Sequence, residues 1–280
     1  MNKKYRFLFR RKIALLGFLF ITALIFTAIA APFLARVSPL TLDPANKLIP
    51  PGGVALLGTD NFGRDVASRA IYGARTSLVG GFGVVVLSTG LGVLTGAVAG
   101  YFRRLEPFLM RIIDVMMAFP PLLLALVLVS IFGRGMVNVI IAVGATYLTR
   151  TARVVYALTL KIRTEPYIEA ATAGGVKPFA IVLRHILPNM LSPIIVQSTF
   201  TFAFSLLDLA ALDFLGLGIP PAIPSWGNML SEGRMYLTRA PWLLLCPGAC
   251  IVLTVLSFNL AGDALRDRLD PQLRRNIEGV

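Results

Sequence analysis

Charged residues and metal-binding side chains are scarce in this sequence of 280 residues. Only 15% of the residues are charged, 56% are hydrophobic, the mean hydropathy is +0.76, and His185 is the single histidine. Soluble domains carry about 25% charged residues, so the composition excludes a soluble enzyme and a disordered chain. One histidine excludes a site with two histidine ligands, and we expect no bound metal. The composition is that of an integral membrane protein.

Several signatures of enzymes are also absent. A phosphate-binding loop needs a glycine directly before its lysine, and no lysine in this sequence follows a glycine. The Gly-x-Ser-x-Gly pattern of serine hydrolases is missing as well. We therefore expect no enzymatic chemistry and no cofactor in this chain. The two cysteines, Cys246 and Cys250, lie in one apolar run and are expected to be small apolar side chains rather than a disulfide.

Long uncharged stretches predict six membrane-spanning helices. The first, between Lys12 and Arg36, follows a basic N-terminus as in a signal peptide, but it is long enough to cross a bilayer, so we expect an uncleaved span. The second, between Arg75 and Arg103, is rich in glycine, which lets helices pack closely in lipid. The other four run from Asp114 to Ile131, from Arg134 to Tyr147, from Met190 to Leu212 and between Arg239 and Asp263.

The basic residues predict the orientation of these spans. The sequence has 27 Lys and Arg against 14 Asp and Glu, a net charge of +13. In a soluble protein this excess would favour nucleic-acid binding. Most of the basic residues, however, fall in the N-terminus, residues 101–111, residues 150–188 and the tail from residue 263, and cytoplasmic loops of membrane proteins collect Lys and Arg. We expect an all-α polytopic protein with both termini in the cytoplasm (N-in/C-in) and no nucleic-acid partner.

The segment of residues 36–76 is expected outside the membrane. It is rich in proline and glycine, so irregular structure with a short helix is predicted. We group this segment with the N-terminal tail and the first span as one unit, residues 1–76. The remaining five spans form the predicted core, residues 77–280.

The segment of residues 160–188 is expected in the cytoplasm. A helix over residues 165–173 is predicted to break at Gly174 and Gly175, to restart at Pro178 and to end at Pro188. Two short helices joined at a glycine corner form a compact protrusion, which is an unusual structure for a connecting loop. We therefore expect the function of the chain to depend on this segment.

Few carboxylates fall within the expected spans. Asp114 lies near the cytoplasmic start of the third span, and Asp208 and Asp213 lie toward the outer end of the fifth. A carboxylate inside a membrane favours a functional role such as proton transfer, but all three lie near span ends, where interfacial water solvates them. Pro120 and Pro193 are expected to kink the third and fifth spans, either along a translocation path or for packing.

The sequence from Glu169 to Pro188 carries a specific motif. It reads Glu-Ala-Ala, three residues, Gly175, and a final Leu-Pro. This pattern resembles the EAA loop of ABC importer permeases. His185 stands where that family usually has an apolar residue, and the form His-Ile-Leu-Pro-Asn, residues 185–189, is similar to the branch that imports peptides and nickel.

Three further stretches resemble the C-type transmembrane subunit of the same branch. Residues 57–75 read LGTDNFGRD and continue to SR and GAR. Residues 214–227 read FLGLG followed by PSWG, and residues 259–271 read NLAGDALRD followed by LDP. Four motifs in one order, over residues 8–275, make the resemblance specific. Asp208 departs from it, because the family pattern has glutamate at this place.

The resemblance implies one of the two transmembrane subunits of an importer in the cytoplasmic (inner) membrane of a bacterium. Its partners would be a homologous second permease, two ABC ATPase subunits that hold ATP and Mg²⁺, an extracytoplasmic substrate-binding protein and the lipid bilayer. The EAA loop would act as a coupling helix that docks on an ATPase. To this contact we assign Glu165, Tyr167, Glu169, Ala170, Ala171, Gly174, Gly175, His185 and Pro188.

Two other sets of residues are assigned. Contact with the binding protein is assigned to Arg64, Asp65, Arg69 and Trp226, although an internal network that shapes the outer loop is an equally open alternative for the three charged residues. Glu169 either pairs with an arginine of the ATPase, which we favour, or caps its own helix. A translocation path is assigned to Asp208, Asp213 and Pro120 from their places in the expected spans and not from the resemblance.

The substrate stays open at this point. Dipeptides or oligopeptides are expected, and nickel is the alternative within the family, because the binding protein sets selectivity. Two other classes of protein are weighed against an importer. A proton-coupled secondary transporter would use Asp114, Asp208 or Asp213, and a membrane scaffold would bind partners without moving any substrate. The four ordered motifs favour the importer.

Overall fold

The computed structural model describes residues 3–53 and 55–269, with side chains from residue 14 onward. Within these residues the regular structure is helical, apart from one isolated bridge between Thr59 and Asp65, so the all-α prediction is confirmed. The helices are α1 (Lys3–Ile29), α2 (Ala31–Leu34), η1 (Pro44–Asn46), α3 (Val66–Tyr101), α4 (Glu106–Met117), α5 (Pro121–Phe132), α6 (Met136–Ile162), α7 (Pro166–Ala173), α8 (Pro178–Ile181), the π-helical segment η2 (Val182–Ile186), α9 (Leu187–Phe214), α10 (Trp226–Gly233), η3 (Arg234–Tyr236) and α11 (Trp242–Leu269).

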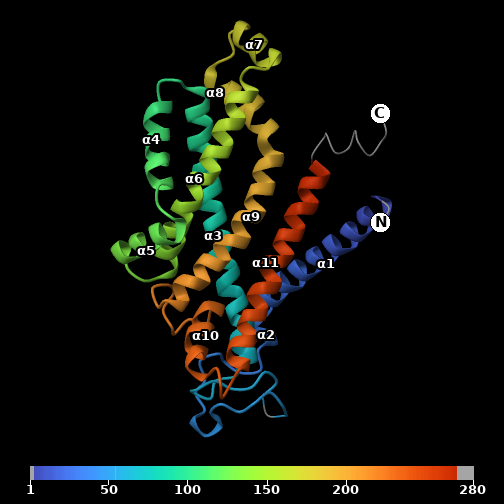
Figure 1. Cartoon of the computed structure of the whole chain (residues 1–280), viewed down its shortest axis with the longest axis vertical. Helices are drawn as coiled ribbons and strands as arrows, with labels where there is room; N and C mark the ends of the chain where they lie inside the picture. The colour runs from blue at the N-terminus through green and yellow to red at the C-terminus, as the bar shows by residue number, and fades with distance from the viewer. Residues whose placement is uncertain (1–2, 54, 270–280) are drawn as a thin grey trace.

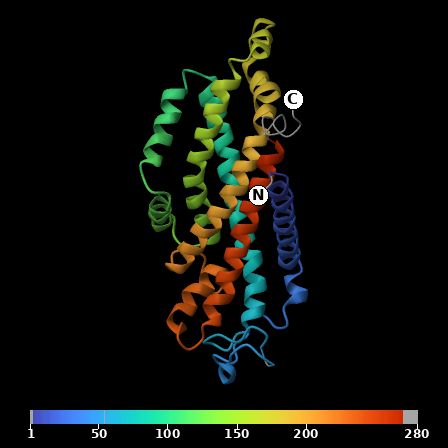
Figure 2. The same ribbon diagram turned by 45° about the vertical axis from the view of Figure 1, so that its right-hand side comes forward.

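The long helices α3, α6, α9 and α11 run along the molecule, and α1 lies beside α11 (Figure 1, Figure 2). Glycines of α3 allow α6 to approach closely. A Cβ atom at Gly92 would lie 2.7 Å from Cβ of Thr151, and one at Gly100 would lie 2.5 Å from Cβ of Thr159. Any larger side chain at these positions would push the two helices apart, which explains the glycine content of the second expected span.

Three helices of the described chain are long and apolar enough to cross a membrane. They are Val66–Tyr101, Pro178–Phe214 and Trp242–Leu269. The pair α4–α5 makes a fourth if it is counted as one bent span, and the apolar part of α1, Ala14–Ile29, is shorter. Helices therefore occupy the regions of all six expected spans, whereas the six-span count and the N-in/C-in orientation stay predictions.

The third expected span differs from the prediction of one kinked helix. α4 and α5 meet at an angle of 96°. Pro120 has extended backbone (φ −55°, ψ 132°) because the ring of Pro121 disfavours helical geometry in the residue before it. α4 is instead tied to α6, by an ion pair between Arg153 and Asp114 and by a hydrogen bond from the Tyr156 hydroxyl. Two successive prolines thus break the span rather than bend it.

The helix after Pro178 also differs from the prediction, because it does not end at Pro188. α8, η2 and α9 form one continuous helix from Pro178 to Phe214. In the π-helical turn the N–H of Leu187 donates to the carbonyl of Val182, five residues back. The side-chain amide of Asn189 donates to the carbonyl of His185 at 2.6 Å. This local hydrogen bonding accommodates a proline, which has no N–H of its own.

The two ends of the molecule have different architectures. At one end, residues 163–186, which we call the knob, extend past the long helices (Figure 1). At the other end, the loop of residues 36–65 lies against α10; we call these two segments the loop end. The loop is irregular with one short 3₁₀ helix, η1, as predicted. The last residues of the LDP motif, Asp270 and Pro271, lie outside the described residues.

Candidate functional site

Glycine and proline give the knob its shape. α7 begins at Pro166, a residue that needs no intrahelical hydrogen bond in the first turn. Its end is a Schellman motif: Gly175 has φ +77°, its N–H donates to the carbonyl of Thr172 at 3.1 Å, and the next N–H donates to the carbonyl of Ala171 at 3.1 Å. Pro178 then begins α8. The predicted glycine corner between two short helices is confirmed.

Two isoleucines anchor the knob to the long helices. Ile168 of α7 and Ile181 of α8 are 2% and 0% exposed. They pack in a cluster that includes Ala97 of α3, Val155 of α6 and Met190 of α9. Burying two such side chains stabilises the knob by about 3–6 kcal/mol. The knob is therefore a fixed extension of three long helices and not a loose loop.

The opposite face of the knob is exposed and partly apolar. Tyr167, Phe179 and Leu183 are 44%, 67% and 47% exposed, and Ala170 is exposed between them in sequence. A Cβ atom built at Gly175 would meet no atom within 4 Å, so the corner itself faces open space. Exposed apolar side chains grouped on a rigid protrusion are typical of a surface that binds another protein.

The residues assigned to the ATPase contact lie together in the knob or directly after it. Glu165, Ala171 and His185 are half-buried, and the others are exposed. Within the part of the chain that the structure describes, Glu169 forms no side-chain hydrogen bond and does not cap α7, whose N-cap residue is Glu165. The carboxylate of Glu169 is therefore free for a partner, and the contact with an ATPase stays a prediction.

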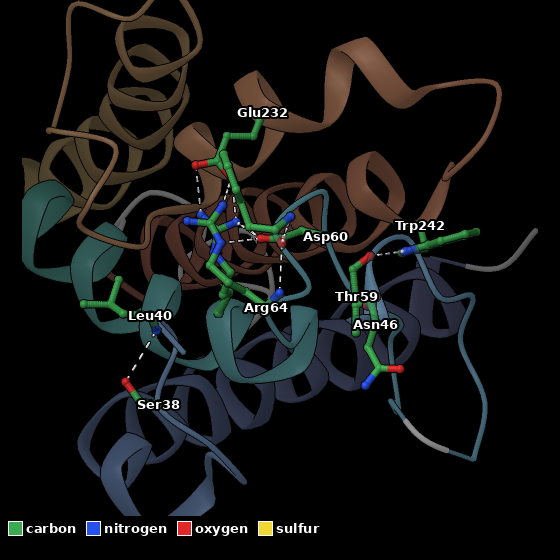
Figure 3. A network of polar contacts seen from close by, with 10 residues as sticks. Ser38, Leu40, Asn46, Thr59, Asp60, Arg64, Glu232 and Trp242 are labelled. Carbon is green, nitrogen blue, oxygen red and sulfur yellow. Dashed lines mark hydrogen bonds and ion pairs between the residues drawn. The ribbon is translucent and has the colours of Figure 1, made fainter. Parts of the chain in front are cut away.

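At the loop end, four charged side chains from distant parts of the chain form one network (Figure 3). Asp60 accepts from Nε of Arg64 and from Nη1 of Arg69, each at 2.6 Å. Glu232 of α10 accepts from Nη2 of Arg64 at 2.5 Å and from Nη1 of Arg69 at 2.6 Å. Near this network, the Nε1–H of Trp242 in α11 donates a hydrogen bond to the carbonyl of Thr59. The loop is thereby fixed to α3, α10 and α11.

This network lies inside the protein. Asp60 and Arg69 are each 2% exposed, and Arg64 is 7% exposed. Two cations face two carboxylates, so the charges balance, and each ion has hydrogen-bonded partners that offset its desolvation. For Arg64 and Arg69, this arrangement is the internal network that the sequence left as an alternative, whereas Asp65 is not part of it. Contact of this end with a binding protein stays a prediction.

Asp65 and Trp226 also have structural roles within the chain. The carboxylate of Asp65 accepts from the N–H of Ser68 at 2.8 Å and caps the N-terminus of α3. The ring of Trp226 is 1% exposed, and its Nε1–H donates to the carbonyl of Ala70 at 3.0 Å. A Cβ atom at Gly73 would lie 2.9 Å from this ring, so α3 and the start of α10 are in close contact.

Asp213 fixes the turn that follows α9. It is 4% exposed, and it accepts from the N–H of Ile219 at 2.7 Å and from the hydroxyl of Ser225 at 2.6 Å. The same hydroxyl accepts from the N–H of Asn228, so it caps α10 as well. Asp213 therefore positions α10, and with it Glu232. A place for Asp213 or for Pro120, at the exposed α4–α5 break, in a translocation path stays a prediction.

Asp208 has a partner that sequence reasoning missed. The hydroxyl of Tyr147 in α6 donates to Oδ2 of Asp208 in α9 at 2.7 Å. Tyr147 is 6% exposed and packs with Val143 and Leu209, so its ring is fixed and Asp208 is held from one side. Sequence reasoning also missed the part that Glu232 takes in the ion network of the loop end. Neither contact leaves a signal in the sequence, because each joins residues far apart along the chain.

No group of three or more His, Cys, Asp or Glu side chains within the described residues has the spacing of a metal site. The functional features of the molecule are thus an exposed knob, a closed and charge-balanced loop end, and a tyrosine–carboxylate pair between them. A helical membrane protein with this arrangement has, at one end, an exposed surface suited to binding a partner.

The chain belongs to the family described as "binding-protein-dependent transport system inner membrane component", whose model matches residues 88–275. A second model, the N-terminal transmembrane domain of oligopeptide transport permease C, matches residues 5–51. The resemblance to peptide-family ABC importer permeases, and to their C-type subunit, is confirmed. The chain is therefore a transport component.

Curated relatives cover nearly the whole chain. A dipeptide transport system permease protein, DppC, of Alkalihalophilus pseudofirmus is 43% identical over 98% of this chain and 90% of its own length. A di/tripeptide permease protein, DppC, of Pseudomonas aeruginosa is 43% identical over 93% of this chain and 88% of its own. A glutathione permease protein, GsiD, of Pectobacterium atrosepticum is 40% identical over 96% and 90%.

The fold is similar to a solved ABC transporter. A chain of the inward-facing methionine transporter MetNI aligns with a TM-score of 0.57 at 20% sequence identity, over 73% of this chain and 96% of that chain. At this identity the similarity concerns the fold alone. It agrees with the helical arrangement described above.

Proposed function

We propose that this chain is a transmembrane permease subunit of an ABC importer that moves di- or oligopeptides across the inner membrane of a bacterium. The observation that carries the proposal is the rigid, exposed knob with an EAA-type sequence on a chain that has no phosphate-binding loop. The names of the similar permeases support peptides as the cargo.

In this proposal the knob is the contact with an ATPase subunit. Partner ATPases hold ATP and Mg²⁺ and hydrolyse the nucleotide, and α7 docks in a groove on one of them. Ala170 and Ala171 permit close approach, and Glu169 offers a free carboxylate to a basic side chain. Because Ile168 and Ile181 bind the knob to three long helices, movement of the ATPases displaces these helices as a body and gives alternating access.

The proposed orientation places the knob in the cytoplasm and the loop end outside. The bias of basic residues toward the N-terminus and residues 150–188 supports it. The binding protein then docks on the exposed surface of the loop end and the adjoining η3, where Leu56, Phe62 and Met235 are 64%, 46% and 78% exposed. A homologous second permease completes the pore.

Co-purification from native membranes tests the proposed assembly. The chain is isolated in mild detergent and its companions are identified by mass spectrometry. We expect a second permease and one or two ABC ATPases. Recovery of the chain alone, or only with copies of itself, contradicts the proposal. The co-purified system is then assayed with its binding protein for peptide or nickel binding, which separates the two substrates of the family.

A glycine variant tests the knob as the transmitting element. Gly175→Val places a β-branched residue at φ +77°, which only glycine adopts readily. We expect loss of ATP-driven peptide uptake in proteoliposomes with assembly near normal. Gly248→Val is the matched control, because a Cβ atom at this helical position meets nothing within 4 Å. Uptake at the wild-type rate in Gly175→Val would show that the knob does not transmit movement.

A proton-coupled carrier is the alternative from another class, and it has its own test. The triple variant of Asp114, Asp208 and Asp213 to asparagine stops a carrier that depends on a proton gradient. An ABC importer instead requires ATP and the partner subunits whatever the gradient. A scaffold shows no flux in the complete reconstituted complex.

A further inference from the structure

All carboxylates among the described residues of the loop end are engaged within the chain. Asp43 accepts from the side-chain amide of Asn46 at 2.7 Å. Asp60 and Glu232 pair with the two buried arginines of the ion network, and Asp65 caps α3. These four acidic side chains are buried or half-buried, so little negative charge reaches the surface of this end.

The cations outside that ion network are exposed instead. They are Arg36 and Lys47 in the loop, and Arg234 and Arg239 after α10. None of the four forms an ion pair with a described residue. Arg234 lies over the ring of Phe214, with 5.4 Å between its guanidinium carbon and the ring centroid, and this contact leaves its positive charge in place. Every exposed charge in the described part of this region is therefore positive.

Topology does not account for this excess of exposed positive charge. Outer loops of membrane proteins carry fewer Lys and Arg than cytoplasmic loops, and in the proposed orientation the loop end is outside. The fold does not need these cations either, because the carboxylates of this end have other partners. Exposed charge of one sign is typical of a surface that attracts an oppositely charged partner.

The segment after α10, residues 234–239, combines two of these cations with apolar side chains; we call it the outer ridge. Met235 and Leu237 are 78% and 59% exposed. Tyr236 between them is half-buried, and its carbonyl accepts from the N–H of Arg239 at 3.0 Å and from the next N–H at 2.7 Å. The backbone of the outer ridge is therefore fixed, and the ridge presents apolar side chains between two arginines.

Lys47 is held close to the outer ridge by the hydrogen bonds of Thr59. The hydroxyl of Thr59 donates to the carbonyl of Asn46 at 2.6 Å, and the carbonyl of Thr59 accepts from Nε1–H of Trp242 at 3.2 Å (Figure 3). Asn46 directly precedes Lys47, and Trp242 follows the outer ridge by three residues. Lys47 and the two arginines of the ridge thus belong to one region of the surface.

We propose that the outer ridge and Lys47 form a positively charged docking surface for an acidic face of the extracytoplasmic binding protein. This inference rests on the proposed function and adds the chemistry of the contact. Carboxylates of the partner pair with the three cations, while Met235 and Leu237 supply the apolar centre of the contact. Attraction between opposite charges raises the rate of encounter, and salt weakens it. Headgroups of anionic lipids are the other source of negative charge, and the experiment separates the two.

Binding of the partner at two salt concentrations tests this surface. The complete complex is held in nanodiscs of phosphatidylcholine, and the dissociation constant of the system's binding protein is measured by biolayer interferometry at about 50 and about 500 mM NaCl. For wild type we expect this constant to rise by about tenfold or more between the two. Arg234→Glu with Arg239→Glu places like charges opposite each other, so we expect binding about tenfold or more weaker at low salt, with no further weakening by salt.

A matched variant controls for net charge. Arg103→Glu with Arg104→Glu changes the charge of the complex equally, but both residues are exposed just after the end of α3 that lies away from the loop end. We therefore expect this variant to bind within about twofold of wild type. Equal weakening in both double variants overturns the inference, because net charge alone then explains the effect.

A photo-cross-linker makes the test independent of these charge changes and of their effect on folding. p-Benzoylphenylalanine replaces Met235 in the otherwise unchanged complex, and the cross-linked peptide of the binding protein is identified by mass spectrometry. We expect a peptide rich in Asp and Glu. A cross-link to a peptide without carboxylates, or to lipid only, overturns the inference.

Three outcomes separate the inference from lipid binding and from the proposed function. If phosphatidylglycerol raises the melting temperature of wild type but not of the ridge double variant, and both bind the binding protein equally, the cations serve lipid and the inference is wrong. If the wild-type complex neither binds the binding protein nor takes up peptide, the proposed function fails as well. If wild type takes up peptide and the double variant binds within about twofold of it, the importer stands and only this inference is wrong.

Discussion

The knob and the loop end use the same kinds of residue in opposite ways. Both contain at least one left-handed glycine, an acidic residue before a helix and two arginines. At the knob, Gly175 faces open space and Arg184 is exposed. At the loop end, Gly63 lies against the backbone of Asp43, and Arg64 is 7% exposed within a balanced ion network.

This difference shows where each end makes its contacts. The loop end is closed on itself, because its polar groups bind α3, α10 and α11. The knob is fixed only along its inner side by Ile168 and Ile181, and its outer side has no partner within the described chain. A segment folded in this way holds its shape before a partner arrives, which reduces the entropy lost on binding.

The largest expected effect comes from removing a buried charge at the loop end. Arg69→Met leaves Asp60 and Glu232 with one arginine between them, and breaking a buried ion network in this way costs about 3–5 kcal/mol. The free energy of unfolding, measured by denaturant titration in mixed micelles, reports the loss. The same substitution in the knob, Arg184→Met, should change it by less than about 0.5 kcal/mol. Equal losses would remove the contrast between the ends.

One left-handed glycine from each end gives a second, smaller contrast. Gly63 and Gly175 have φ +78° and +77°, so alanine strains the backbone equally at both, by about 1–2 kcal/mol. At Gly63 the new Cβ atom would also overlap the carbonyl oxygen of Asp43. Gly63→Ala should therefore be more destabilising than Gly175→Ala by about 1–3 kcal/mol in the same titration. If the two variants are equally stable, the loop is not held against Asp43.

The helix caps give the smallest contrast. Asp65 caps α3 through the N–H of Ser68, so Asp65→Ala should lower the free energy of unfolding by about 1 kcal/mol. Glu165, at the start of α7, makes no capping hydrogen bond, so Glu165→Ala should lower it by less than about 0.5 kcal/mol. Thermal unfolding of both variants in detergent checks the difference. A larger loss in Glu165→Ala would show a contact of that side chain with its surroundings.

Local sequence signals predicted the knob well. Two glycines followed by a proline favour a turn and then a new helix start. The turn at Gly175 and the start of a helix at Pro178 could therefore be predicted from the local sequence. The prediction that the second short helix ends at Pro188 was wrong, because a π-helical turn and the amide of Asn189 let the helix continue. The kink at Pro120 is in fact a break of 96° between two helices.

Contacts between distant segments could not be predicted in the same way. Glu232 is separated from Arg64 by 168 positions and Tyr147 from Asp208 by 61. Charge alone did not reveal that Arg64 and Arg69 turn inward, since a lone arginine in a loop is usually solvated. The family motifs identified the segments that matter, and the packing of the helices determined which side chains within them are free.

The π-helical turn at residues 182–186 has a geometric consequence. Because hydrogen bonding continues through it, one helix runs from Pro178 in the knob to Phe214 beside the loop end, a contour of about 55 Å at 1.5 Å per residue. If this helix moves as one body about a point near its midpoint, its two ends move in opposite directions. In the proposed importer, such a movement, started at the knob by an ATPase, would displace the turn held by Asp213 in the opposite direction, so that one helix would couple the two ends of the molecule.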